Sequence, residues 1–151
     1  MLNRTHLVIA LFFVLLFFPL VENKITFSLI ALFSSMVPVI DVSTSKLGKR
    51  RIFRPLQFFI KHRGFFHSLL FMVLILSFFL VFYPAGAFAF FVGYSSHLIA
   101  DSFTPEGVRF FYPSKKAISG NIKSGGKLEK LVFILFVFLD VFLIFIRFFR
   151  I

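Results

Sequence analysis

Five long apolar runs, separated by short polar or basic segments, make up most of the 151-residue chain. The runs cover about residues 5–21, 25–40, 64–82, 85–101 and 128–149. A soluble domain of this size would have to expose much of that apolar surface, whereas a bilayer solvates it. The pattern predicts an all-α membrane protein, a single multi-pass domain over 1–151 built as a compact bundle of about five transmembrane helices.

The first run has a competing interpretation, because a short basic start followed by an apolar stretch also describes a secretory signal peptide. No small-x-small cleavage site follows it, since the next residues are Glu22-Asn23-Lys24. We therefore expect a first transmembrane helix, with Glu22-Asn23-Lys24 as a tight turn before the second helix.

Two longer connections, residues 41–61 and 102–127, are basic and contain helix-breaking residues such as Gly48, Pro55 and Pro105. The formal net charge of +11 could indicate nucleic acid binding. However, the basic residues fall between the apolar runs, as they do in membrane proteins, so we expect a lipid bilayer and no nucleic acid as partner. The absence of cysteine excludes disulfides and thiolate metal sites.

If the five helices alternate in direction, their polar ends meet at one side of the membrane. His6 starts the first helix, Asp41 ends the second, His62 and His67 open the third, and His97 with Asp101 closes the fourth. Of the 17 Lys and Arg, only Lys24, Arg147 and Arg150 fall on the other side, which leaves 14 on the histidine side. The positive-inside rule then predicts a cytoplasmic N-terminus and a cytoplasmic histidine cluster.

The spacing of these residues limits what they can do. His97 and Asp101 stand at i and i+4, so they share a helix face within reach of one ion, although a simple His–Asp hydrogen bond explains the pair equally well. His62 and His67 cannot share a face, but Gly64 lets the chain turn between them. Arg63 and Ser68 could bind an anion near the helix N-terminus; the alternative is a basic helix start at the interface.

The other polar residues have simpler explanations as well. His6 could be a solvated residue, and Asp41 could cap the following turn with Ser43 and Thr44. Asp140 lies inside the last apolar run, where an ionisable group is costly, and we expect it to pair with a polar group of another helix.

Four imidazoles and two carboxylates form a nitrogen and oxygen ligand set, which suits a divalent transition metal such as zinc or manganese. A metal with an open position lowers the pKa of bound water and makes it a nucleophile. Nearby basic groups such as Lys46, Arg51 and Arg63 favour a phosphate-bearing substrate. The predicted metal ligands are His6, Asp41, His62, His67, His97 and Asp101.

Several of these residues stand in motifs that resemble the YdjM-like family, described from its motifs as LexA-binding, inner-membrane-associated, metal-dependent hydrolases. The resemblance spans about residues 4–120 and rests mainly on His62-Arg63-Gly64-x-x-His67-Ser68 and on Gly93-Tyr94-Ser95-Ser96-His97-Leu98-x-x-Asp101-x-x-Thr104-Pro105-x-Gly107. Thr5-His6, Pro38-x-Ile40-Asp41 and Tyr112-Pro113-Ser114-Lys115-Lys116 add to it. It implies an inner-membrane location and a hydrolytic activity.

One motif departs from the family pattern, which usually reads Pro-Asp-x-Asp-His. This chain has Pro38-Val39-Ile40-Asp41-Val42, so an aspartate and a histidine are replaced by valines. A second metal, if the family binds two, would lose ligands here, and an inactive member of the family is therefore an alternative.

The sequence as a whole predicts a metal-dependent hydrolase at the cytoplasmic interface, acting on a phosphoester or lipid-linked substrate. Asp41, His67 and Asp101 are the predicted catalytic residues, and Lys46, Arg63 and Ser68 the predicted substrate-binding residues. One alternative is a non-catalytic scaffold whose basic loops bind anionic lipid or a cytoplasmic partner. Another is a small transporter or proton relay that uses the histidines.

Overall fold

The computed structural model describes residues 1–41 and 64–149, without the side chains of Ile40, Asp41 and Phe148. Within these ranges the all-helical class and the five helices are confirmed, and strands are absent apart from an isolated bridge between Val108 and Ile118. In chain order the α-helices and the short 3₁₀ helices, marked η, are α1 (Asn3–Phe17), η1 (Phe18–Leu20), α2 (Lys24–Met36), η2 (Val37–Asp41), η4 (Phe65–His67), α4 (Leu69–Phe82), α5 (Pro84–Ser102) and α6 (Lys127–Phe149).

Local capping explains where several helices begin. The side chain of Asn23 accepts a hydrogen bond from the backbone N–H of Thr26 and starts α2, directly after the predicted turn. The Ser68 hydroxyl accepts one from the N–H of Phe71 and starts α4. Pro84 occupies the first turn of α5, where its missing N–H costs nothing.

The C-terminal end of α5 is held by the residues that follow it. The Thr104 hydroxyl donates to the carbonyl oxygen of Asp101 at 2.7 Å, and Thr104 is fully buried. Gly107 has a φ of +63°, a conformation that other residues rarely adopt, and a Cβ there would meet the backbone of Ile118. These contacts fix the turn after α5 and thereby the position of Asp101.

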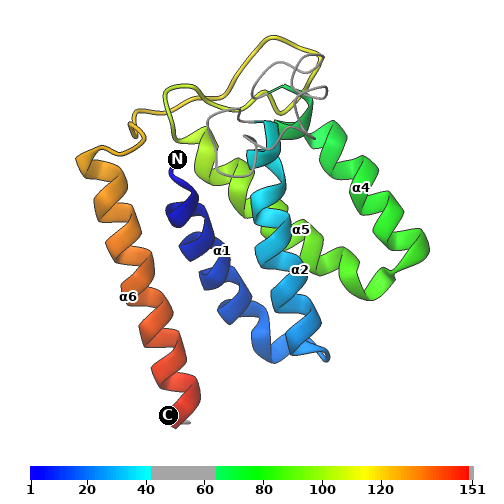
Figure 1. The fold of residues 1–151 in the computed structure, drawn as a ribbon, viewed down its shortest axis with the longest axis vertical. Helices are drawn as coiled ribbons and strands as arrows, with labels where there is room; N and C mark the ends of the chain where they lie inside the picture. The colour runs from blue at the N-terminus through cyan, green and yellow to red at the C-terminus, as the bar shows by residue number, and fades with distance from the viewer. Residues whose placement is uncertain (42–63, 150–151) are drawn as a thin grey trace.

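Helices α2 and α5 pack most closely, and α1 lies beside them (Figure 1). Helix α4 packs against α5, and α6 packs mainly against α1. Two adjoining apolar clusters form the interior. One contains Val14, Phe27 and Val92, and the other contains Met72, Phe90, Tyr94 and Leu98. Neighbouring helices run in opposite directions, so five helix ends lie together at one end of the molecule (Figure 1). These are the starts of α1, α4 and α6 and the ends of α2 and α5. We call this end the histidine pole.

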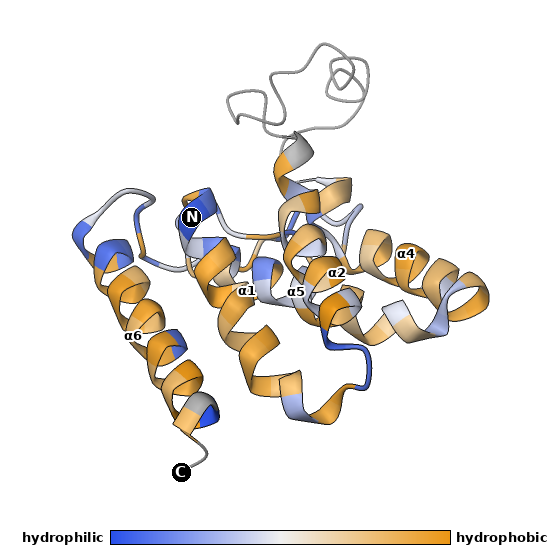
Figure 2. Cartoon of the chain, turned by 60° about the horizontal axis from the view of Figure 1, so that its bottom comes forward, coloured by the Kyte–Doolittle hydropathy of each residue, from blue (hydrophilic) through white to orange (hydrophobic). Residues whose placement is uncertain are grey.

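The outer surface of the helices is apolar. Leu20, Ile25, Phe33, Val81 and Phe82 each expose more than 70% of their surface. Hydrophilic residues lie mostly at the helix ends and in the connections (Figure 2). Among the described residues, one helical segment, Asn3–Leu20, is long and apolar enough to cross a membrane, and Lys24–Val39 and Leu69–Phe82 are shorter apolar helices. A continuous apolar exterior of this kind is typical of a surface that another apolar phase covers.

Asp140 lies in the middle of α6 and exposes only 5% of its surface. Its Oδ1 atom has no hydrogen-bond partner among the described residues. The pairing with a polar group of another helix therefore stays a prediction.

Candidate metal centre

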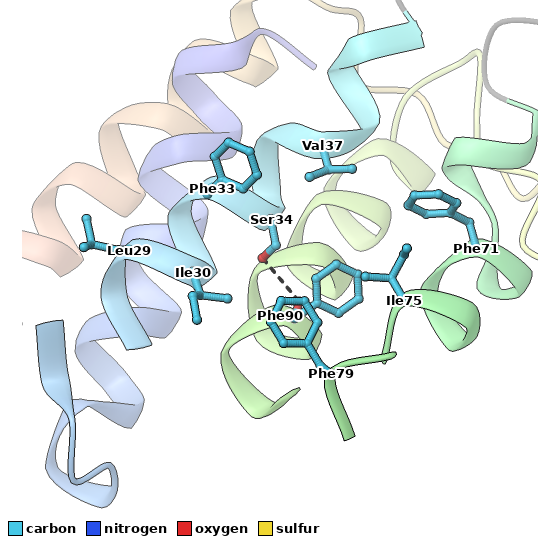
Figure 3. A pocket seen from close by; sticks show the side chains of 9 residues that line it. All are labelled: Leu29, Ile30, Phe33, Ser34, Val37, Phe71, Ile75, Phe79 and Phe90. Atoms are coloured by element: carbon cyan, nitrogen blue, oxygen red, sulfur yellow. Dashed lines mark hydrogen bonds between the residues drawn. The ribbon is translucent and has the colours of Figure 1, made fainter. Parts of the chain in front are cut away.

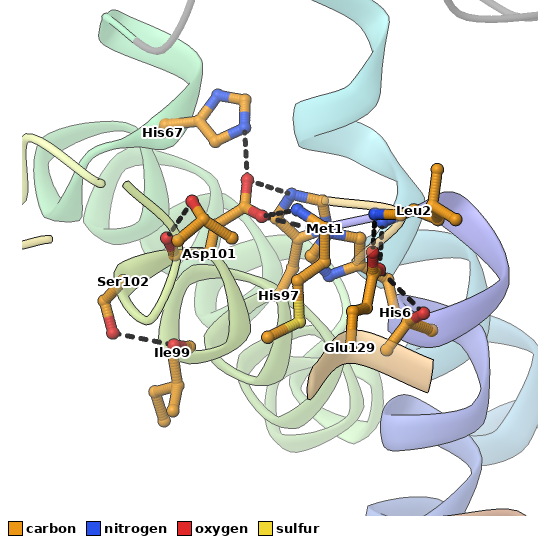
Figure 4. Close-up of polar contacts among 12 residues, drawn as sticks. Met1, Leu2, His6, His67, His97, Ile99, Asp101, Ser102 and Glu129 are labelled. Atoms are coloured by element: carbon orange, nitrogen blue, oxygen red, sulfur yellow. Dashed lines mark hydrogen bonds and ion pairs between the residues drawn. The ribbon is translucent and has the colours of Figure 1, made fainter. Parts of the chain in front are cut away.

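Three helix ends deliver polar side chains to one buried point at the histidine pole. Asp101, near the end of α5, lies at its centre. Its Oδ1 is 3.2 Å from Nε2 of His6 on α1, and its Oδ2 is 3.6 Å from Nε2 of both His67 on η4 and His97 on α5 (Figure 4). Each of the four residues exposes 3% of its surface or less. The predicted convergence of these four residues is thus present in the structure.

The rings of His6 and His97 stack with centroids 3.8 Å apart and an interplanar angle of 13°. Together with Asp101 they place three possible ligand atoms within 4.8 Å of one another. His67 completes the cluster, its ring 5.4 Å from that of His97. Two imidazoles and one carboxylate at this separation can hold one metal ion.

The hydrogen bonding of His97 decides which of its nitrogens is available. Its Nδ1 lies 2.6 Å from the carbonyl oxygen of Ser35 on α2. A carbonyl oxygen only accepts, so Nδ1 carries the proton and Nε2 presents its lone pair. Among the described residues, this buried Nε2 has no hydrogen-bond partner. Histidines that bind metals commonly donate their other N–H to a backbone carbonyl in the same way.

His6 shows a similar feature. Its Nδ1 is buried and lacks a hydrogen-bond partner within the described part of the chain. Buried polar atoms without partners are rare, because each costs the desolvation of the group. Two of them in one cluster, both imidazole nitrogens, fit a site that takes up a cation.

Asp101 already attracts positive charge in this arrangement. The Met1 ammonium lies 2.5 Å from its Oδ1. An ammonium and a metal ion would both be drawn to this carboxylate, which lies at the centre of the histidine cluster (Figure 4). The contact shows that a cation fits beside Asp101.

Glu129, in the first turn of α6, ties the start of α1 to the start of α6. Its Oε1 accepts from the Leu2 N–H at 2.5 Å and from the Thr5 hydroxyl at 2.9 Å, and its Oε2 accepts from the Gly125 N–H. Leu2 is the N-cap of α1, so the carboxylate satisfies donors at that helix terminus. Because Thr5 precedes His6, the same contacts hold His6 in place.

Tyr94 performs a comparable task for His67. Its hydroxyl donates to the carbonyl oxygen of Phe66 at 2.5 Å, and the Tyr94 side chain is fully buried on α5. This bond joins α5 to η4, which ends at His67. The orientation of His67 toward Asp101 therefore depends on a contact between two elements that are distant in sequence.

The structure assigns Ser68 a structural task. Its hydroxyl donates to the Phe65 carbonyl at 2.6 Å and caps α4, and the side chain is buried. Its predicted role in substrate binding stays a prediction. Lys46, His62 and Arg63 lie outside the described residues, as does the side chain of Asp41, whose backbone ends η2. Of the two valines that depart from the family pattern, Val39 is buried in η2, and Val42 lies outside the described residues.

Sequence reasoning overlooked three contributors to the site. Glu129 carried no distinguishing signal, since acidic residues are common in the first turn of any helix. The Ser35 carbonyl is a backbone group and has no signature at all. Tyr94 is part of a motif, but its partner Phe66 could not be read from spacing.

Comparisons with known proteins indicate one family. A sequence model of the family described as YdjM inner membrane protein matches residues 1–149. The inner membrane proteins YdjM of Escherichia coli (strain K12) and Shigella flexneri are each 36% identical over 94 residues, which covers 56% of this chain and 48% of theirs. The chain thus spans about half the length of the curated relatives it matches. No solved structure matches it significantly.

Proposed function

The chain belongs to the YdjM inner membrane protein family, and on that basis we propose that it is a multi-pass inner-membrane hydrolase that uses a divalent metal at the cytoplasmic interface. Its substrate class is a phosphoester, including lipid-linked phosphates. The observation that carries the proposal is the buried Nε2 of His97, which lacks a hydrogen-bond partner in the described chain and lies 3.6 Å from Asp101 while Nδ1 is engaged by Ser35.

The donor set supports zinc or manganese. His6, His97 and Asp101 supply two imidazole nitrogens and a carboxylate oxygen, and the chain has no thiolate to add. Within the described residues His67 is the next imidazole, with its ring 5.4 Å from that of His97. Asp41 and His62 are further ligands that we propose from the sequence. When bound, such a metal polarises a phosphoryl oxygen and lowers the pKa of water.

The chain's own residues have separate tasks in this proposal. Asp101 holds the imidazoles of His6 and His67 by its two oxygens and keeps a negative charge at the centre of the cluster. His67, which stands on a short 3₁₀ turn rather than within a long helix, is placed to accept or return a proton of the attacking water. Arg63 and Lys46 are proposed to hold the anionic group of the substrate.

The membrane location rests on the family and on the surface of the molecule. Large apolar side chains cover the outside of α2, α4 and α6, for example Leu29, Val81 and Phe138, which expose 65%, 72% and 66% of their surface. Water would make that exposure costly, whereas lipid would not. The excess of basic residues at the histidine pole places this pole on the cytoplasmic side in our proposal.

Metal analysis of the purified full-length protein tests the proposal. We expect stoichiometric zinc or manganese in the wild type and its loss in His97→Ala and Asp101→Asn. Ser102→Ala is the control, because Ser102 adjoins Asp101 but its hydroxyl only donates to the Ile99 carbonyl within α5. Helical circular dichroism establishes that each variant folds. A wild type that binds no transition metal after addition of zinc or manganese, or equal metal content in all four proteins, would overturn the proposal.

A second candidate function is a scaffold that binds anionic lipid through its basic loops. Lys115, Lys116, Lys123, Lys127 and Lys130 are all exposed at the histidine pole, which favours such binding. The Met1 ammonium could satisfy Asp101 without a metal. If the protein is such a scaffold, its binding to anionic vesicles should be sensitive to salt and should survive replacement of the histidines. If it is a hydrolase, the same replacements should abolish substrate turnover.

A further inference from the structure

A groove of about 540 Å³ runs between α2 and α4, with α5 behind it (Figure 3). Phe33 of α2 and Val37 at the start of η2 line one side, Ile75 and Phe79 of α4 line the other, and the buried Phe90 of α5 forms its floor. The volume lies within the usual range for small-molecule sites, roughly 300–1,000 Å³.

The groove offers almost no hydrogen-bonding capacity. Ser34 is the single polar side chain among the described residues that line it, and its hydroxyl is directed to the carbonyl oxygens of Ala31 and Phe90 at 3.1 and 3.3 Å. A peptide or a sugar lying there would leave its own polar groups unsatisfied, which costs several kcal/mol per group in an apolar setting. A hydrocarbon chain has no such groups and meets no penalty.

One end of the groove adjoins the histidine cluster. Ser34 directly precedes Ser35, whose carbonyl oxygen lies 2.6 Å from His97 Nδ1. Phe71, at the same end on α4, packs its ring against Phe65 and Phe66, the two residues before His67. From this end the groove extends along α2 and α4 toward the middle of the bundle, past Ile75 to Phe79.

The groove also faces outward. Leu29 and Phe33 on its rim expose 65% and 73% of their surface. In a membrane-embedded bundle this rim contacts lipid, so a lipid can enter sideways without crossing water. Lys115 and Lys116 are exposed in the connection at the histidine pole, shortly after Tyr112, whose ring packs against Phe65. They provide positive charge at the end of the groove where the headgroup of that lipid would lie.

We propose that the α2–α4 groove binds the acyl chain of a phospholipid whose phosphate headgroup lies at the histidine pole. This inference rests on the proposed function and narrows its substrate class to lipids with a phosphate headgroup and a hydrocarbon chain. The groove then fixes the depth of the lipid and brings its phosphoester to the level of His67, His97 and Asp101.

The chain contains no tryptophan, so a single introduced tryptophan reports on its own surroundings. Phe33→Trp places one on the groove rim, and Phe78→Trp places one on the exposed face of α4 outside the groove. Each full-length variant is reconstituted in phosphatidylcholine vesicles that contain a small fraction of dibrominated phosphatidic acid or of dibrominated phosphatidylcholine. Both lipids carry bromine on the acyl chain, so the depth of a tryptophan in the bilayer affects its quenching by either lipid equally. The ratio of the two quenching values therefore removes the difference in depth between positions 33 and 78.

We expect the quenching by brominated phosphatidic acid, divided by that of brominated phosphatidylcholine, to be several-fold higher at Phe33→Trp than at Phe78→Trp. Adding unbrominated phosphatidic acid should lower the ratio at Phe33→Trp again. Adding Ile75→Phe to Phe33→Trp fills the groove and should lower the ratio, whereas adding Val73→Phe, on the exposed side of the same helix, should not. Equal ratios at the two tryptophans would mean that ordinary host lipid or another part of the chain occupies the groove, and would overturn the inference.

The same samples separate this inference from the proposed function. Stoichiometric metal together with equal quenching ratios overturns the acyl-chain site alone. Selective quenching of Phe33→Trp by brominated phosphatidic acid, together with the absence of bound metal in both this variant and the wild type, overturns the metal-dependent hydrolase alone and leaves the lipid site in place.

Discussion

Gly93 of α5 lies so close to Ala31 of α2 that a Cβ on the glycine would stand 1.9 Å from the Ala31 carbonyl oxygen. No side chain fits in that space, and the obstacle is backbone rather than a movable side chain. The two helices therefore approach at their backbones, as small residues allow in helix pairs within membranes. This approach brings His97 within hydrogen-bonding distance of Ser35.

Gly93→Ala should push α2 and α5 apart. We expect a loss of about 1–3 kcal/mol in the free energy of unfolding, the usual cost of overpacking, together with weaker metal binding because the contact between His97 and Ser35 lengthens. Unfolding in mixed detergent micelles measures the first effect. Gly86→Ala on the same helix is the control, since the nearest atoms that its Cβ would meet are ring atoms of Phe79 and Tyr83, which can move. Equal losses for both variants would contradict the backbone contact.

Glu129→Ala should loosen the start of α6 from the start of α1. Three donors, the N–H groups of Leu2 and Gly125 and the Thr5 hydroxyl, lose their acceptor. We expect about 1–3 kcal/mol of lost stability, since buried donors are left unsatisfied, and weaker metal binding through His6. Thermal unfolding and metal titration measure these effects. Glu22→Ala removes an exposed carboxylate between η1 and α2 and should change neither quantity.

Tyr94→Phe removes the hydroxyl that joins α5 to the Phe66 carbonyl. We expect about 1 kcal/mol of lost stability from this single hydrogen bond and a lower affinity for metal if His67 contributes to the site. Tyr83→Phe, at a partly exposed tyrosine between α4 and α5, is the matched control. An unchanged metal affinity in Tyr94→Phe, at reduced stability, would show that His67 is not a ligand.

Removal of metal should destabilise the wild type but not His97→Ala. A ligand that binds only the folded state at a hundredfold excess over its dissociation constant stabilises it by about 2.7 kcal/mol. A chelator should therefore lower the melting temperature of zinc-loaded wild type, and fresh zinc should restore it. A melting temperature of the wild type that zinc does not change would oppose a metal site at His6, His97 and Asp101.

The orientation of the bundle can be read with single cysteines, because the native chain has none. Ser119 is exposed in the loop at the histidine pole, and Glu22 is exposed in the turn at the opposite end of α1. In sealed right-side-out vesicles, a membrane-impermeant maleimide should label Glu22→Cys, whereas Ser119→Cys should react only in inverted vesicles. Labelling of both from the same side would contradict a bundle that spans the membrane.

The sequence by itself determined the helices and their polarity. Apolar runs between polar breaks placed five helices close to their observed bounds, because the length and composition of each run are local properties. Alternation of helix direction then brought His6, His67, His97 and Asp101 to one pole, since short connections such as Glu22-Asn23-Lys24 force antiparallel neighbours. The motifs also identified the family, which the match over residues 1–149 confirms.

Only the tertiary structure decided how these residues meet. The proton on His97 is placed by a carbonyl of α2, and Glu129 reaches across from α6 to a helix more than 120 residues earlier in the chain. Ser68, a candidate for anion binding by its position, uses its hydroxyl to cap α4. Backbone groups and long-range partners leave no periodic mark on the sequence, because their contacts arise from packing between helices rather than from spacing along one of them.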